Sequence, residues 1–215
     1  MSRRTTLAGL VAIAAAAFGL YSSGALGSSD GWETQPDAPA SALAKRMLGE
    51  LTVAPEDNSR DYDRDEWMDG WDTISANCDA RELILAREAI EANVGEDCYP
   101  ASGRWRGVYT DRTLTRARDV QIDHIVPLEE ANGSGTTAWT REQRHSFSHD
   151  PENLWAVDGS ANQSKGSKDP AQWRPQRQTV WCEYASRWVA VKHKYNLTID
   201  RAERWRLAQM LGTCR

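Results

Sequence analysis

The sequence predicts an α+β fold in which two short strands and a helix lie at the centre of a mainly helical, disulfide-stapled single domain. The strands are predicted at residues 120–126, a run rich in β-branched residues, and at the short apolar run 154–157. Apolar residues recur at helical spacing between residues 176 and 211. The 215 residues are enough for one domain with its own hydrophobic core.

The amino terminus has the pattern of an export signal. Arg3 and Arg4 precede an apolar, alanine-rich run at residues 7–21, and small residues follow at 25–27. We therefore expect residues 1–27 to be a cleaved signal peptide and the protein to be secreted as a monomer without stable membrane association. The alternative is an uncleaved membrane anchor, because the apolar segment nearly reaches the ~20 residues that span a bilayer.

The remaining elements are predicted from composition and spacing. Residues 28–39 are rich in Ser, Asp, Pro and Gly, which is typical of a disordered linker, and the folded domain is expected at 40–215. Helices are predicted at 40–51 and at 79–94, where Asp79 and Glu82 form a capping-box start. Further predictions are a strand at 104–109, a long loop at 129–151, and helices at 176–195 and from Asp200 onward.

The four cysteines indicate disulfides rather than a zinc site. They are even in number, follow an apparent export signal, and none of their spacings suits zinc. Three pairings are open. The nearest-neighbour pairing joins Cys78 to Cys98 and Cys182 to Cys214.

The net charge of −5 is unevenly divided along the chain. Lys and Arg minus Asp and Glu gives −12 for residues 28–98, +1 for 99–180 and +4 for 181–215. Electrostatic affinity for nucleic acid is therefore expected to come from the second half of the chain, and to be modest and sensitive to salt.

The strand at 120–126 carries the residues with the clearest chemistry. His124 has an ordinary pKa near ~6.5 and can accept a proton from water at neutral pH. Asp123 offers a hard oxygen ligand for a metal ion. Because successive side chains of a strand point to opposite faces, the two residues can serve different tasks.

A second part of the site is predicted at a helix start. Ser160 and Gln163 form a capping-box pattern, which places Asn162 in the first turn and Lys165 on the same face. The amide oxygen of Asn162 can join Asp123 as a ligand. Oxygen donors favour one divalent ion, Mg²⁺ or Mn²⁺, over zinc.

Taken together, Asp123-His124-Ile125-Val126-Pro127, then Asn153-Leu154, then Asn162-x-x-Lys165-Gly166 resemble the HNH, or ββα-metal, endonuclease family. The resemblance is greatest to its secreted bacterial branch with a DHIVPL-type core, and the motif core covers about residues 118–170. A lone Asp-His pair says little, but these three groups in this order are specific.

The resemblance implies a role for each matched residue. Asp123 and Asn162 would bind the metal, His124 would be the general base, Asn153 would fix the imidazole through its backbone carbonyl or side chain, and Lys165 would lie near the scissile phosphate. Tyr62-x-Arg64-x-x-Trp67 also resembles a motif that precedes the site in the secreted branch.

The function that these residues predict is hydrolysis of phosphodiester bonds in DNA, and in RNA as an alternative substrate, with little sequence preference. Arg141 and Arg144, in the predicted loop at 129–151, are the expected substrate contacts. Two other functions remain open: a nuclease toxin delivered to competing cells, and a nucleic-acid-binding protein with an inactive HNH site.

Overall fold

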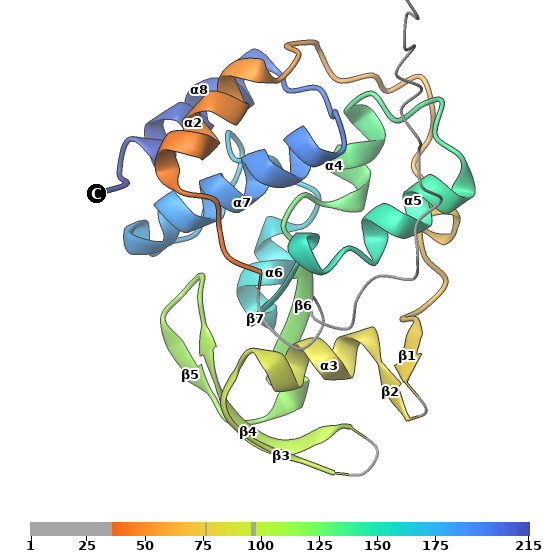
Figure 1. Cartoon of the computed structure of the whole chain (residues 1–215), viewed down its shortest axis with the longest axis vertical. Helices are drawn as coiled ribbons and strands as arrows, with labels where there is room; N and C mark the ends of the chain where they lie inside the picture. Colours follow the sequence, from red (N-terminus) through yellow and green to blue (C-terminus); the bar gives the residue numbers. More distant parts are fainter. Residues whose placement is uncertain (1–35, 76, 96–97) are drawn as a thin grey trace, which may run out of the picture.

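A computed structural model describes residues 36–75, 77–95 and 98–215. The expected signal peptide and residues 28–35 of the expected linker lie outside these residues. Figure 1 shows the strands β6 (Val120–His124) and β7 (Leu154–Asp158) at the centre, with most helices above them and a smaller layer of strands and one helix below.

The two-stranded sheet of β6 and β7 is buried on both faces. Its antiparallel register places Asp123 opposite Trp155 and His124 opposite Leu154. Side chains alternate between two cores: Ile122 packs in the lower core, whereas Trp155 and Val157 belong to the larger upper core. This two-sided burial is consistent with the apolar run at residues 154–157, and it means that the polar side chains of Asp123 and His124 are buried as well.

The upper layer is helical. Helix α2 (Ser41–Glu50) packs beside α7 (Trp181–Lys194) and α8 (Arg201–Leu211), as Figure 1 shows. Asp200 caps α8 by accepting hydrogen bonds from the backbone of Ala202 and Glu203. A disulfide joins Cys182 to Cys214 and ties α7 to the end of α8, as the nearest-neighbour pairing predicts.

The lower layer corrects the predicted helix at 79–94. Helix α3 is only Ala80–Arg87, with the predicted capping box at Asp79, and the chain then continues as strand β3 (Ala89–Val94). The physical reason is that β3 pairs with β4 (Pro100–Gly107), and this pairing overrides the local helix propensity from which the prediction was made. The other strands here are β1 (Thr73–Ser75), β2 (Cys78–Asp79) and β5 (Arg112–Leu114). The second disulfide, Cys78 to Cys98, links β2 to the β3–β4 turn.

The predicted loop at 129–151 is mostly helical, which is a second correction. It contains α4 (Leu128–Gly133) and α5 (Arg141–Ser148). Thr140 and Gln143 form a full capping box at the start of α5, a local signal that the loop prediction overlooked.

Helix α6 (Gly159–Lys165) follows β7 directly. Its cap is Asp158 rather than Ser160, because the Asp158 carboxylate accepts from the backbone of Ala161 and Ser160 only supports that carboxylate through its hydroxyl. Short 3-10 turns complete the described chain at Arg64–Glu66, Ala117–Asp119, Pro151–Asn153 and Gln178–Val180.

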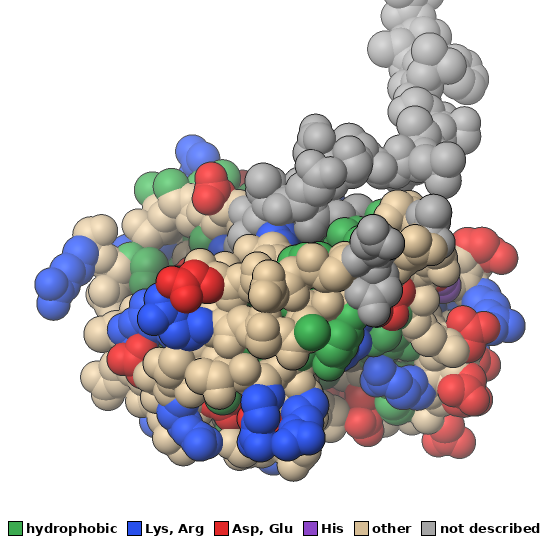
Figure 2. All heavy atoms as spheres, turned by 90° about the horizontal axis from the view of Figure 1, so that it is seen from below, with side chains coloured by type: hydrophobic (Ala, Val, Ile, Leu, Met, Phe, Trp, Pro, Cys, Tyr) green, Lys and Arg blue, Asp and Glu red, His purple; other side chains and the backbone are tan. Residues whose placement is uncertain are grey.

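Charge is unevenly spread over the surface. Figure 2 shows several groups of Lys and Arg side chains on the left and lower middle of the face seen from below, and most of the Asp and Glu side chains toward its right edge. Within the described ranges, the longest apolar helices are still too short or too polar to span a bilayer.

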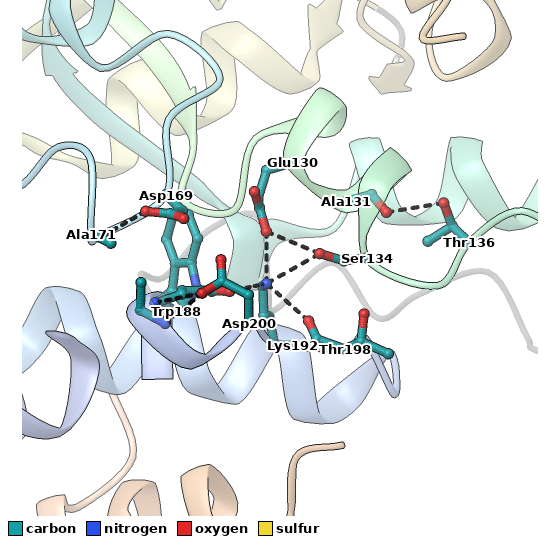
Figure 3. Close-up of polar contacts among 12 residues, drawn as sticks. Glu130, Ala131, Ser134, Thr136, Asp169, Ala171, Trp188, Lys192, Thr198 and Asp200 are labelled. Carbon is teal, nitrogen blue, oxygen red and sulfur yellow. Dashed lines mark hydrogen bonds and ion pairs between the residues drawn. The ribbon is translucent and has the colours of Figure 1, made fainter. Parts of the chain in front are cut away.

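A buried polar cluster ties the upper helices to α4. Lys192 Nζ donates to Glu130 Oε1 and Glu203 Oε2, both at 2.7 Å, and to the carbonyl oxygen of Thr198 at 3.0 Å (Figure 3). Burial lowers the pKa of Lys192, but the attraction of the two carboxylates outweighs it, so the net shift is upward. Burial raises the pKa of Glu203 to about 8, because one ammonium cannot fully compensate two carboxylates.

The cluster makes stability depend on pH. The folded state keeps the Glu203 proton to pH about 8, whereas the unfolded chain releases it near ~4.3. The free energy of unfolding should therefore fall as pH rises between these values. Glu203→Gln, which cannot ionise, should make the pH profile flatter in urea unfolding experiments. Glu183→Gln, at a half-exposed residue that pairs with Arg187, is the control and should keep the wild-type slope. A Glu203→Gln profile as steep as wild type would contradict this assignment.

Candidate active-site cleft

A cleft of about 370 Å³ opens beside the end of β6. Its walls bring together residues that are far apart in the sequence. They come from the segment before β1, from β6 and the start of α4, and from α6 and the turn after it. The lining residues are Tyr62, Arg64, Gln121, Ile122, Asp123, His124, Pro127, Leu128, Glu129, Asn162, Gln163, Gly166 and Ser167. The predicted residues Asp123, His124 and Asn162 thus share one cleft.

Asp123 is held on both carboxylate oxygens. Lys165 Nζ donates to Oδ1 at 2.8 Å, and the hydroxyl of Tyr109 donates to Oδ2 at 2.6 Å. Lys165 is fully buried and also donates to the carbonyl oxygen of His124 at 2.8 Å. Lys165 is therefore a buried partner of the carboxylate rather than an open phosphate contact.

Burial affects both members of this ion pair. It raises the pKa of Asp123 and lowers the pKa of Lys165, because each charge loses its hydration. Each group offsets part of that cost for the other, since the ammonium and the carboxylate lie in direct contact. Tyr109 cannot share the charge, because burial raises its pKa well above the ordinary value and it stays a neutral donor.

His124 is a buried, neutral imidazole. Burial lowers its pKa from about 6.5 to about 3, and the positive charge of Arg64 acts in the same direction. Its Nε2 lies 2.8 Å from the carbonyl oxygen of Ser148. Because a carbonyl can only accept, Nε2 carries the proton and Nδ1 keeps the lone pair that can act as a base.

Asn153 has a different task from the one expected. Its amide accepts from Val126 N at 2.9 Å and donates to Val126 O at 3.2 Å, and its backbone carbonyl accepts from Ile125 N. It thereby fixes the chain that leaves β6. The carbonyl of Ser148, on α5, holds the imidazole instead.

The donor set in the cleft fits a hard divalent ion. Asn162 Nδ2 donates to Gln121 Oε1 at 3.0 Å, so the orientation of the amide is set and its oxygen is the end left for a cation. The Asp123 carboxylate has about four lone-pair positions, and Lys165 and Tyr109 use only two of them. A carboxylate and an amide oxygen are ligands that Mg²⁺ and Mn²⁺ accept.

The segment at 62–71 supplies residues whose role the sequence did not reveal. Tyr62 and Arg64 line the cleft, and Trp71 stacks on His124 with ring centroids 6.1 Å apart and planes 8° from parallel. Trp67 lies in the upper core. The Tyr-x-Arg-x-x-aromatic pattern was the available signal, and it marks one wall of the site.

The two arginines expected to contact substrate lie elsewhere. Arg144 is 3% exposed, donates to Thr136 O and covers the Trp67 ring, so it is a core residue and the expectation for it needs correction. Arg141 is exposed, near Asp65 and Asp69, and it does not line the cleft.

A second hollow of about 360 Å³ adjoins the cleft and shares Gln121 and Gln163 with it. We call it the arginine hollow, because Arg112, Arg116 and Arg118 line it. Arg116 pairs with Asp119, but the three guanidinium groups outnumber the two carboxylates of Asp119 and Asp158 in its lining. This hollow was not predicted, because the side chains of Arg112 on β5 and of Arg116 and Arg118 at the following 3-10 turn are brought together only by the folded chain.

Comparisons with known proteins agree with a nuclease-related site. A family model described as "GmrSD restriction endonucleases, C-terminal domain" matches residues 82–210, which include the cleft residues of β6 and α6. A protein from Arthroderma benhamiae, named "Uncharacterized secreted protein", is 41% identical over 183 residues, which is 84% of this chain and 89% of that protein. No solved structure matches the chain.

The buried ion pair gives a prediction about stability. Lys165→Met should leave the Asp123 charge buried without its counter-ion and lower the free energy of unfolding by about 3–5 kcal/mol. Urea unfolding in the presence of EDTA measures this change. Asp123→Asn in the same chain should recover part of the loss.

Lys168→Met is the matched control, because Lys168 is exposed and donates only to the carbonyl oxygen of Ser164. It should change the free energy of unfolding by less than about 0.5 kcal/mol. Equal unfolding midpoints for Lys165→Met and Lys168→Met would show that the ion pair does not stabilise the fold.

Proposed function

The chain belongs to the family of GmrSD restriction endonuclease C-terminal domains, and on that premise we propose that it is a secreted, metal-dependent endonuclease of the HNH type. It would hydrolyse DNA, and RNA as a second substrate, with little sequence preference. The observation that carries the proposal is the convergence of Asp123, His124 and Asn162 on one cleft.

The local architecture supports the HNH assignment. Two antiparallel strands, β6 and β7, are followed at once by α6, which is the order of a ββα unit. Asp123 and His124 end the first strand, Asn153 precedes the second, and Asn162 lies on the helix. We take residues 118–170 as the motif core of a domain that covers residues 40–215.

Asp123 and Asn162 are the residues that would hold one divalent ion, Mg²⁺ or Mn²⁺. Such an ion supplies Lewis-acid stabilisation of the charge that develops on phosphate oxygens. Lys165 and Tyr109 keep the Asp123 carboxylate in a single orientation through hydrogen bonds to both of its oxygens. The ligand is thus preorganised before substrate arrives.

His124 is the general base in this mechanism. Water attacks the phosphorus atom, its proton passes to Nδ1 of His124, and the bond from phosphorus to the 3′-oxygen breaks. The leaving 3′-oxygen takes a proton from a solvent water molecule, which leaves a 5′-phosphate and a 3′-hydroxyl. The Ser148 carbonyl and the Trp71 ring hold the imidazole in place. An anionic phosphate in the cleft would raise the pKa of His124 by favouring its charged form.

Substrate binding is assigned to two groups of arginines. Arg64 lines the cleft and is the candidate contact to the scissile phosphate. Arg112, Arg116 and Arg118 in the adjoining arginine hollow would hold the neighbouring backbone phosphates. Contacts to phosphates carry no base information, in keeping with low sequence preference.

Secretion of this chain is supported by three observations. The amino terminus has an export pattern, the Arthroderma benhamiae relative is named a secreted protein, and the four cysteines form two disulfides. Disulfides persist in oxidising compartments outside the cytosol.

The catalytic assignment predicts the effect of two substitutions. His124→Ala should lower the rate of plasmid cleavage about a hundredfold or more, since a general base contributes ~10² to 10⁴. Asn162→Ala should instead raise the Mg²⁺ concentration needed for half activity. Digestion of plasmid DNA and of RNA over a Mg²⁺ series, with EDTA blanks, measures both.

His193→Ala is the control, because this half-exposed histidine pairs with Glu50 and does not line the cleft. It should cleave at the wild-type rate. A correctly folded His124→Ala protein that does the same would rule out His124 as the base.

A further inference from the structure

Three potential metal ligands gather outside the cleft, at the junction of α5 and the segment before β1. They are Asp72, His145 and His149, and one ligand atom from each lies within 4.8 Å of the other two. None of them lines the cleft described above. Asp72 and His145 are partly exposed, so an ion could enter from solvent.

Helix α5 brings the two histidines together. His145 lies in its last turn and His149 is its carboxyl-terminal cap, so the two are one helical turn apart. Their rings stack with centroids 4.2 Å apart. The i, i+4 spacing of His145 and His149 is present in the sequence. It places both side chains on one face only in a helix, whereas a loop was predicted at residues 129–151.

Both ring nitrogens of His149 have polar neighbours. Its Nδ1 lies 2.9 Å from the Ser148 hydroxyl and 3.2 Å from the His145 carbonyl oxygen, and its Nε2 lies 3.1 Å from the Gly70 carbonyl oxygen. A neutral imidazole has one proton, and the Ser148 hydroxyl can accept from Nδ1 or donate to it, so either tautomer can be accommodated. With the proton on Nδ1, the lone pair of Nε2 faces Gly70 O and Asp72, which is an arrangement of donors suited to a metal ion.

The distances between ligand atoms are close to those around a tetrahedral ion. Metal bonds of about 2.0–2.1 Å place neighbouring ligand atoms roughly 3.3–3.4 Å apart. Here Asp72 Oδ1 lies 3.1 Å from His145 Nε2 and 3.7 Å from His149 Nε2. Small rotations of the two exposed side chains would complete the site.

The chemistry of the ligands selects the ion. Two imidazole nitrogens and one carboxylate suit borderline-soft transition metals such as Zn²⁺, whereas Mg²⁺ and Ca²⁺ prefer sites made of oxygen. The Gly70 carbonyl oxygen is available as a fourth donor. The contact from His149 Nδ1 to the His145 carbonyl is the kind of outer contact that orients a ligating imidazole.

The same group of residues supports the imidazole of the cleft. Ser148, whose carbonyl accepts from His124, lies between the two histidines in the chain. Trp71, next to Asp72, stacks on His124 and meets His149 edge to face at 6.0 Å. An ion here would join both elements that position His124.

We propose that Asp72, His145 and His149 form a second metal site, selective for Zn²⁺ and similar transition metals. An ion bound there would stabilise the segment and helix that position His124 in the cleft. This site is separate from the oxygen-ligand site of Asp123 and Asn162. Its existence does not depend on nuclease activity.

Zn²⁺ titration of the chelator-treated mature protein tests the proposal, with calorimetry or a chromophoric chelator as readout. Wild type should bind one Zn²⁺ per chain. His145→Ala and Asp72→Asn should each bind it at least tenfold more weakly, and both residues are exposed enough for the variants to fold. His124→Ala and His193→Ala should bind as wild type does.

Co²⁺ gives a second readout that does not depend on stability. Its visible absorption should report a site with nitrogen ligands in wild type and in His193→Ala, and it should be lost in His145→Ala. The absence of Zn²⁺ binding by wild type, or equal affinity in wild type and His145→Ala, would overturn the proposal and leave a hydrogen-bonded His and Asp cluster. Loss of binding in His124→Ala alone would make His124 itself a ligand of the ion and would also overturn the proposal.

Discussion

The rest of the site depends on the buried contact between Lys165 and Asp123. Through it, α6 is anchored against β6, since the same ammonium group also donates to the carbonyl oxygen of His124. Asn162, one turn earlier on α6, is thereby brought to the cleft that Asp123 and His124 line. The carboxylate is kept in the core by its counter-ion, so a ligand and a base can lie in a buried two-stranded sheet without an uncompensated charge.

Sequence reasoning was successful where the signal is local. The run of β-branched residues at β6, the Asp79 capping box and the helix start at Asp200 were each predicted correctly, because a strand composition or a helix start depends only on neighbouring residues. The position of α6 followed in the same way, although Asp158 and not Ser160 caps it. The three groups of motif residues were expected together, and the structure places Asp123, His124 and Asn162 in one cleft.

Several errors share one cause, which is that burial and pairing are decided by residues outside the local pattern. Strand β3 was predicted as helix because its pairing with β4 is not part of the helical spacing seen in residues 79–94. Arg144 was expected to contact substrate, but it is buried against the Trp67 ring, which comes from another part of the chain. The partner of the imidazole is likewise Ser148, 24 residues away in sequence, and no local pattern announces that contact.

The most direct test of the account is to locate a bound ion. Crystals of the His124→Ala protein with Mn²⁺ and a short DNA duplex would give an anomalous signal for the metal. We predict a peak in the cleft at about 2.0–2.2 Å from both an Asp123 carboxylate oxygen and Asn162 Oδ1, with a DNA phosphate beside it. Mn²⁺ bound away from both residues, with the DNA on another face of the protein, would contradict the central claim.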